Sequence, residues 1–309
     1  MNVMKKKINL VVVGSVALDE IETPKARRTA VLGGAATYAC AAASFFTRAG
    51  MVGVVGSDFP KRERKRLEAF DIDLQGLQCV EGATFRWSGV YEADFIQRRT
   101  LDTQLGVFAD FAPQLPEAYR EAEYLLLGNI MPVLQLDVLK QAKRARFVAV
   151  DTMNFWIDKT RDDLMKVIAH STLLSLNDEE ARLLTGKHNL RDCADAMLAM
   201  GPRFIVIKKG EHGALLFTKR RIAIIPAYLT RHIADPTGAG DTYAGAFMGC
   251  LAAQRSTREQ DLIAALHTAS VVASFGVEAF GLDRLEAITP RLIAARQREL
   301  RAMLHHGLD

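Results

Sequence analysis

The sequence predicts an α/β fold with a central, mostly parallel β-sheet. Short apolar runs, each ended by a glycine, asparagine or aspartate, alternate with helical stretches over most of the 309 residues. Continuous β-branched runs are typical of strands buried on both faces, and regular alternation of strands with helices is typical of parallel sheets. The predicted sheet strands are residues 8–13, 124–127, 147–150, 173–176 and a run that begins at Phe204.

Two predicted hairpins interrupt this alternation. Residues 84–91 and 95–100 alternate residue types and are separated by a short polar turn, which is a hairpin pattern. A second hairpin is predicted from residues 214–217 and 222–225. Helices are predicted over residues 61–70, 261–275 and 289–304.

Composition and charge exclude several classes of protein. Hydrophobic residues make up 49% of the chain and charged residues 25%, which is ordinary for a folded, soluble protein. The net charge of +4 is too small to argue for a nucleic-acid partner, and the charged run 61–66 is expected to be a solvated helix face. Residues 29–47 carry no charge, but glycines and polar residues interrupt them, so we expect a buried helix and no membrane span.

The four cysteines indicate the redox compartment. Cys40, Cys79, Cys193 and Cys250 stand far apart, with no C-x-x-C pair and no neighbouring histidine. This spacing indicates neither a zinc site nor a disulfide framework, and a reducing cytoplasm fits it best.

Residues 235–241, which read D-P-T-G-A-G-D, carry the strongest chemical signal. Gly238 and Gly240 let the backbone turn tightly, and a run of small residues then begins a helix. The first N–H groups of a helix lack intrahelical partners and carry partial positive charge, so this turn is a seat for an anion such as phosphate. Asp241 lies beside that seat and can take a proton from an attacking hydroxyl. A plain helix start after a glycine turn is the alternative, and no Walker A pattern is present.

This stretch resembles the C-terminal signature D-[PT]-T-G-A-G-D of the PfkB (ribokinase-like) carbohydrate kinases. The resemblance implies a ribokinase-like three-layer α/β/α fold, one kinase domain over residues 1–309, and a small β lid near residues 17–33 and 83–108. It also implies ATP and Mg²⁺ as cofactors and a possible homodimer through the lid. By resemblance Asp241 is the catalytic base, and the amides of Gly238, Ala239 and Gly240 form the anion hole.

The residues that bind the phosphoryl acceptor are expected at the ends of the early strands. By resemblance Asp19 binds acceptor hydroxyls and Gly33 and Gly34 close over the substrate, while Tyr38 stands where many family members carry an asparagine. Two further candidates, Asn129 and Asp151, follow predicted strands and would face the same crevice, although they also suit helix capping.

The nucleotide side is expected around a second motif. Asn177 and Glu180 match the family's N-x-x-E, which organises magnesium and phosphates through water, and a helix N-terminus with an acidic first turn is the alternative. Positions three apart share one helix face, which suits such a pair.

The glycine-containing turn that follows the predicted strand beginning at Phe204 is also expected to bind the nucleotide. By resemblance Gly210 and Gly213 give the base and phosphates room, and Lys209 offsets phosphate charge. Thr237 is expected beside the nucleotide, and together with Asp235 it resembles a monovalent cation site, which implies K⁺.

These residues predict transfer of the γ-phosphoryl group of ATP to a hydroxyl of a small sugar or polyol. A nucleoside acceptor is the nearer alternative, because Tyr38 could stack on a base and Phe155 and Trp156 could line a flatter site. A non-catalytic nucleotide-binding regulator is the farther one. Asp241 argues against it, since a degenerate kinase should have lost this residue.

Overall fold

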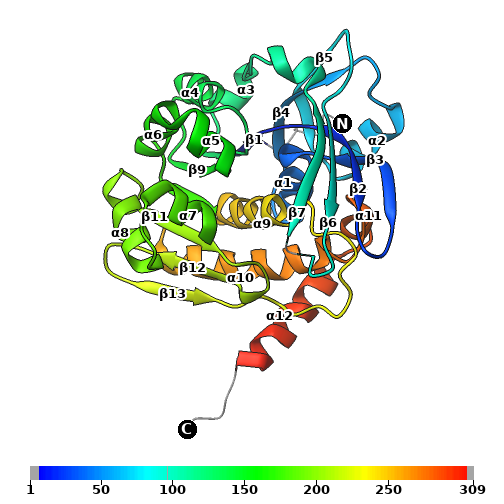
Figure 1. Ribbon diagram of the computed structural model, residues 1–309. Helices are drawn as coiled ribbons and strands as arrows, with labels where there is room; N and C mark the ends of the chain where they lie inside the picture. Colours follow the sequence, from blue (N-terminus) through cyan, green and yellow to red (C-terminus); the bar gives the residue numbers. More distant parts are fainter. Residues whose placement is uncertain (1–6, 96, 305–309) are drawn as a thin grey trace, which may run out of the picture.

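The computed structural model describes residues 7–95 and 97–304, and a nine-stranded sheet forms its centre (Figure 1). Neighbouring strands from β11 to β5 are parallel, and β12 and β13 extend the sheet as an antiparallel hairpin. The carboxyl ends of the parallel strands therefore lie along one edge, where open α/β sheets bind ligands. In spatial order the strands are β13 (Ile222–Ile225), β12 (Ala214–Phe217), β11 (Phe204–Lys208), β10 (Leu173–Asn177), β9 (Phe147–Asp151), β8 (Tyr124–Leu127), β1 (Leu10–Val13), β4 (Ala49–Gly56) and β5 (Asp73–Val80).

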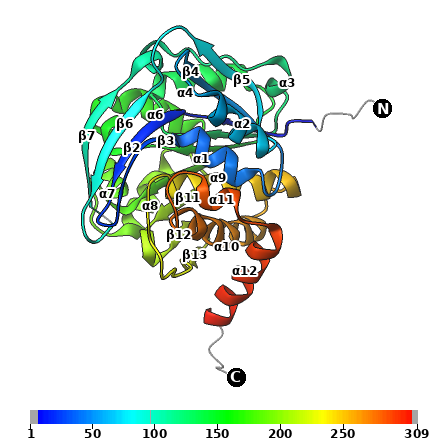
Figure 2. The same cartoon turned by 90° about the vertical axis from the view of Figure 1, so that its right-hand side faces the viewer.

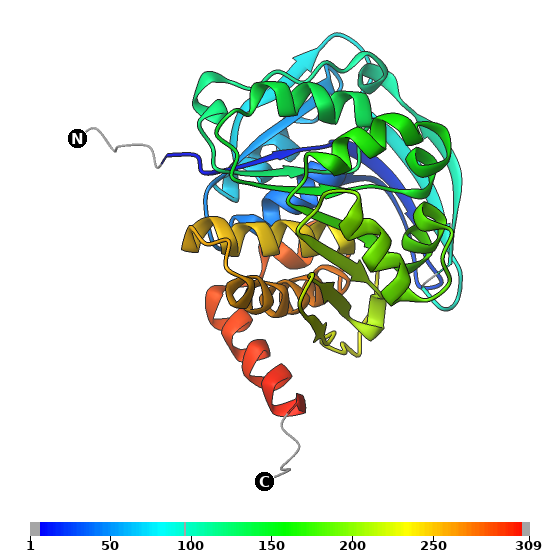
Figure 3. The same ribbon diagram turned by 90° about the vertical axis from the view of Figure 1, so that its left-hand side faces the viewer.

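Helices cover both faces of this sheet (Figures 1 and 3). Two hydrophobic clusters fill the two interfaces, because successive strand residues point to opposite faces. Leu10 and Val12 pack with α1, α9 and α10, whereas Val11 and Val13 pack with helices that include α6, α7 and α8. The helices are α1 (Ala35–Ala43), α2 (Lys61–Ala69), α3 (Glu117–Arg120), α4 (Pro132–Gln141), α5 (Asn154–Lys159), α6 (Arg161–Ala169), α7 (Asp178–Thr185), α8 (Leu190–Ala199), α9 (Ala239–Gln254), α10 (Glu259–Gly276), α11 (Asp283–Glu286) and α12 (Pro290–Leu304), with 3₁₀ turns at Gly106–Asp110 and Gly210–His212.

A second, four-stranded sheet stands along one side of the molecule (Figure 2). Its order is β3-β2-β6-β7, with a parallel β2–β6 pair between two antiparallel pairs. The small sheet occupies the segments expected for the lid. Its strands are β2 (Ala17–Glu22), β3 (Arg27–Gly33), β6 (Arg86–Tyr91) and β7 (Arg98–Gln104).

The predicted fold class is confirmed, and the uncharged stretch 29–47 has a structural explanation. Residues 29–33 complete β3, residues 35–43 form α1, whose nine residues are all buried, and residues 44–47 form the turn that follows. Within residues 7–95 and 97–304, no helix is long and apolar enough to cross a membrane.

The charged run 61–66 is only partly a solvated face. Arg66 on α2 forms ion pairs with Glu63, Asp283 and Glu286, and Glu63 is buried. These contacts tie α2 to α11, so the last arginine of the run has a structural role.

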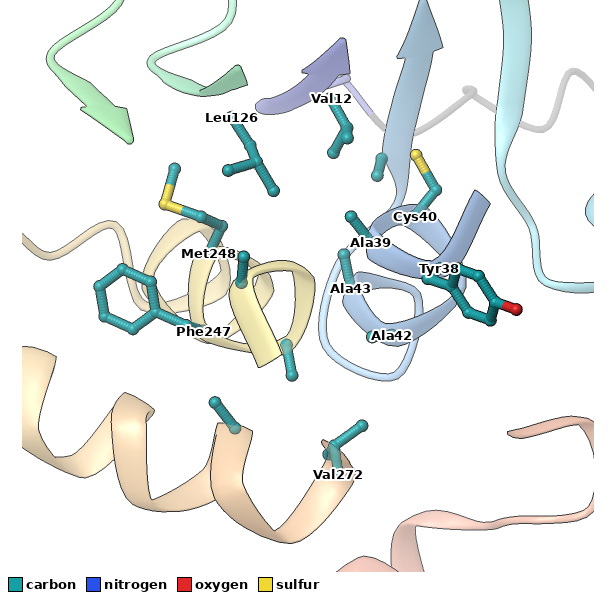
Figure 4. Close-up of a cluster of buried hydrophobic side chains, with 14 of the residues drawn as sticks. Val12, Tyr38, Ala39, Cys40, Ala42, Ala43, Leu126, Phe247, Met248 and Val272 are labelled. Carbon is teal, nitrogen blue, oxygen red and sulfur yellow. The ribbon is translucent and has the colours of Figure 1, made fainter. Parts of the chain in front are cut away.

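Small residues bring α1 and α9 into close contact beneath the sheet (Figure 4). A Cβ placed on Gly245 would lie 2.1 Å from the carbonyl oxygen of Ala39, and one on Gly249 would lie 2.8 Å from the Cα of Ala43. Neither backbone has room for a larger residue. This packing positions the N-terminus of α9, where the signature 235–241 ends.

We expect Gly245→Ala to lower the free energy of unfolding by roughly 1–3 kcal/mol, because the two helix backbones must separate to admit the methyl group. Urea unfolding measures this. Gly276→Ala is the matched control, since a Cβ there meets nothing closer than 3.5 Å. Equal stability of the two variants would show that α1 and α9 separate at little cost.

Candidate active site

The signature forms a tight turn that leads into α9. Gly238 precedes the helix with φ of 72°, a conformation that favours glycine, and the N–H of Ala239 donates to the carbonyl oxygen of Pro236 at 3.2 Å. Asp241 lies in the first turn of the helix. The turn, the helix N-terminus and the carboxylate therefore lie together, as the anion seat requires.

Asp241 has an electrostatic environment suited to a base. Burial raises the pKa of its carboxyl group to about 7, and the charge of Asp151 adds to this effect. The charges of Lys208 and Arg98 act in the opposite direction. A carboxyl group with a pKa near neutrality is well matched to proton transfer at cellular pH.

Lys208, the last residue of β11, lies among three carboxylates. Its Nζ donates to Oδ1 of Asp151 at 2.9 Å. Burial lowers the pKa of this ammonium, but the charges of Asp151, Glu180 and Asp241 outweigh burial and raise the pKa above its usual value. Lys208 therefore stays protonated.

The N-x-x-E motif forms a reciprocal cap at the start of α7. Oδ1 of Asn177 accepts the Glu180 N–H at 2.7 Å, and Oε2 of Glu180 accepts the Asn177 N–H at 2.8 Å. Burial raises the Glu180 pKa to about 7, with Lys208 opposing this. The capping alternative is thus realised, and it also fixes Glu180 beside Lys208.

Asp19, which was expected to bind the acceptor, is almost fully buried on β2 of the small sheet. Burial raises the pKa of its carboxyl group to about 8; the charge of Asp235 adds to this, while the backbone N–H of Trp87 lowers it. A Cβ on Gly33 would lie 2.0 Å from Oδ2 of Asp19, so glycine is needed there. Within the described part of the chain, Oδ1 of Asp19 has no hydrogen-bond partner.

Tyr38 lies beneath the signature turn. It is 2% exposed, and a Cβ on Gly238 would lie 2.2 Å from its ring. Figure 4 shows the ring on the side of α1 away from Met248. This burial leaves no face for stacking on a base. Gly34 precedes α1 with φ of 95°, where a Cβ would lie 2.5 Å from the carbonyl oxygen of Ser15.

Asp235 and Thr237 link the signature to its surroundings. Oδ1 of Asp235 accepts the Thr237 N–H at 2.8 Å, while Oδ2 is buried without a partner among the described residues. The Thr237 hydroxyl donates to the Tyr91 hydroxyl of β6 at 3.0 Å. The signature is therefore tied directly to the small sheet.

Asn129 lies beyond the end of β8 and contacts α5. Its Oδ1 accepts the Trp156 Nε1–H at 2.7 Å, and its Nδ2 lies 3.1 Å from the sulfur of Met153. Phe155 packs edge-on against Trp156 and is 50% exposed. An exposed aromatic surface thus follows β9.

Two consecutive lysines at the end of β11, Lys208 and Lys209, have different surroundings. Lys209 lies beyond the strand, and its N–H donates to the carbonyl oxygen of Gly213 at 2.7 Å. Gly210 has open space around it, whereas a Cβ on Gly213 would lie 2.1 Å from the carbonyl oxygen of Ile225. Of the two lysines, Lys208 lies at the candidate site.

Sequence reasoning missed three residues of this site, namely Lys208, Trp87 and Tyr91. Only Lys208 left a usable signal, as the last residue of a strand whose end was expected to face the ligand. The two aromatics contact the site only because the small sheet folds against the signature.

A glycine turn at a helix N-terminus, a buried carboxylate beside it and a capped N-x-x-E helix in an α/β protein are the features expected of a phosphotransferase that lacks a P-loop. Residues 7–287 match the pfkB family of carbohydrate kinases, and the chain belongs to that family. It is therefore a phosphotransferase with a sugar or nucleoside hydroxyl as acceptor, and kinases of this family use ATP.

Three similar proteins illustrate the range of the family. A cytidine kinase of Thermococcus kodakarensis is 31% identical over 247 residues, which cover 78% of this chain and 87% of the relative. The nucleoside kinase of Burkholderia thailandensis, solved with inosine, superposes with a TM-score of 0.79 at 19% identity, covering 95% and 98% of the two chains. A putative ribokinase II from E. coli, solved with ATP and Mg²⁺, gives 0.77 at 17% identity, covering 94% and 99%.

Proposed function

We propose that this protein is a nucleoside kinase that transfers the γ-phosphoryl group of ATP to a ribose hydroxyl. The observation that carries the proposal is the 31% identity, over most of both chains, to a cytidine kinase. The exposed Phe155 beside Trp156 supports it, since an aromatic face at a strand end suits a flat base. Asp19 supports it too, because its unpartnered carboxylate oxygen suits a ribose hydroxyl.

In this proposal each residue has one task. Asp19 holds the acceptor, and Asp241 accepts the proton of the attacking hydroxyl. The G-A-G turn, formed by Gly238, Ala239 and Gly240, stabilises charge on the phosphoryl oxygens. The small sheet closes over the reacting groups and excludes water, which is a competing acceptor.

Magnesium fits the residues of α7. The described residues contain no cluster of three or more aspartate, glutamate, histidine or cysteine side chains that would form a cage. Mg²⁺ is usually held by one or two carboxylates together with phosphates and water, and Glu180, fixed by its cap through Oε2, has a second oxygen for this role. Bound there, the ion would neutralise phosphate charge.

The remaining assignments rest on single features. Oδ2 of Asp235, buried and unpartnered in the described chain, supports a monovalent cation such as K⁺. Strand β7 lies at an edge of the small sheet with every residue exposed, which supports a homodimer through the lid. The four free cysteines support a cytoplasmic location.

An ADP-release assay with magnesium and ATP tests the acceptor. We expect phosphorylation of one or more ribonucleosides across a panel of cytidine, uridine, adenosine, inosine and guanosine, and little with ribose, fructose or inositol. Turnover confined to free sugars would reject the nucleoside proposal and support a sugar kinase, the reading that the polar residues at the strand ends favour.

A further inference from the structure

We propose that Lys208 is a catalytic residue whose ammonium group contacts the transferred phosphoryl group. This inference rests on the proposed phosphoryl transfer but not on which acceptor is used. In the sheet, Lys208 pairs with Asn177 of the N-x-x-E cap, so it lies at the carboxyl edge beside the nucleotide-side motif.

Distances place the ammonium against the signature turn as well. A Cβ on Gly240 would lie 3.3 Å from Nζ of Lys208, and Nζ lies 2.9 Å from Oδ1 of Asp151. The absence of a side chain at Gly240 keeps the space between the turn and the ammonium open. The same small region is thus bounded by helix N–H groups on one side and by a fixed cation on the other.

The geometry leaves the ammonium free to bind an anion. An ammonium has three N–H donors, and in the described residues Nζ donates only to Asp151. The Lys208 side chain is only 19% exposed, and its ion pair with Asp151 holds the ammonium group in one place. A lysine acts on phosphate as a compact point charge, which a held ammonium can deliver without reorganising.

The charges around Lys208 also support a contact between its ammonium group and the phosphoryl group. Asp151, Glu180 and Asp241 surround this lysine, so without Lys208 the site would hold three carboxylates where a polyphosphate must enter. In the reaction the phosphoryl group leaves the ADP oxygen and bonds to the acceptor oxygen, whose proton passes to Asp241. Lys208 keeps its proton and offsets the charge that develops on the phosphoryl oxygens.

Steady-state kinetics of Lys208→Met, with Lys140→Met as the matched control, test this role. Lys140 lies on α4, is exposed, and like Lys208 pairs with a single carboxylate, that of Asp137. We expect Lys208→Met to lower kcat by roughly a hundredfold with a much smaller change in the KM for ATP, because the contact strengthens in the transition state. Lys208→Arg should recover part of the loss, and Lys140→Met should behave as the unaltered enzyme. Equal losses in the two methionine variants, or an unchanged kcat in Lys208→Met, would refute the proposal.

A double variant separates catalysis from structure, because removing Lys208 leaves Asp151 buried without its partner. The reference is Asp151→Asn alone. If Lys208 only neutralises Asp151, the double variant Lys208→Met with Asp151→Asn should restore turnover to that of the reference; if Lys208 acts on the phosphoryl group, the double variant should stay well below it. Restored turnover would overturn the proposal.

A binding measurement keeps the test independent of the acceptor. ADP with magnesium and aluminium fluoride mimics the phosphoryl group in transfer, and Lys208→Met should weaken its binding relative to ADP by at least about tenfold. An unchanged ratio would reject the role of Lys208. Absence of turnover by the unaltered protein with every acceptor would instead reject the proposed function.

Discussion

Replacing Asp241 with asparagine is expected to lower turnover by roughly two to four orders of magnitude while leaving ATP binding nearly unchanged. The amide keeps the size of the carboxylate but cannot accept the proton of the attacking hydroxyl. Steady-state kinetics give the loss in kcat, and calorimetry gives the ATP affinity. Asp261→Asn is the control, since Asp261 occupies the first turn of α10, where its carboxylate accepts hydrogen bonds from Ser256 and Arg258.

The pH profile provides a second check on the same residue. Burial raises the Asp241 pKa to about 7, and the base must be ionised to act. The kcat/KM of the unaltered enzyme should therefore fall as the pH drops through about 7, and the asparagine variant should lack this dependence. A variant that retains full turnover and the same profile would remove Asp241 from the role of base.

Local patterns predicted the bounds of three strands of the nine-stranded sheet. The strands at 124–127, 214–217 and 222–225 begin and end where the sequence indicated. The small sheet was harder, because β2 pairs in parallel with β6, more than sixty residues away in sequence, and only the family resemblance indicated that these segments meet. The start of the second strand of the first predicted hairpin was also misplaced: β7 begins at Arg98, whereas residue 95 was expected.

In the candidate site, too, local motifs were predicted, whereas contacts between distant residues were not. Its contiguous motifs, the turn before α9 and the cap of α7, were readable because each is built within a few residues. The Lys208–Asp151 pair was not, since it depends on β9, β10 and β11 lying side by side. Tyr38 was interpreted as a residue that could stack on a base, because the burial of a side chain cannot be predicted from its position in the sequence alone. In the structure its ring is buried against Gly238.

Asparagine in place of Asp19 is expected to harm function while stabilising the free protein. Replacing the carboxyl group should lower kcat/KM for the acceptor by roughly ten- to a hundredfold, as expected when one buried hydrogen bond, that of Oδ1 to an acceptor hydroxyl, is lost. Burial raises the Asp19 pKa from 3.8 to about 8, so the folded state favours the protonated carboxyl group. That preference stabilises the fold fully below the unfolded pKa and is lost as the pH rises through about 8. A neutral amide removes this dependence, and Asp19→Asn should raise Tm by roughly a few degrees near pH 8 and by less near pH 6.

Asp58→Asn is the control of opposite sign. Burial slightly disfavours the ionised Asp58, but hydrogen bonds from Thr84 and Arg86 outweigh it and hold its pKa below the usual range, so the charged form stabilises the fold and its loss should lower Tm. Calorimetric scans of both variants from pH 6 to pH 9, with acceptor kinetics at one pH, test the pair. If Asp19→Asn lowers Tm at pH 8 and leaves the acceptor kcat/KM unchanged, Asp19 is a structural residue of the small sheet and the acceptor is held elsewhere.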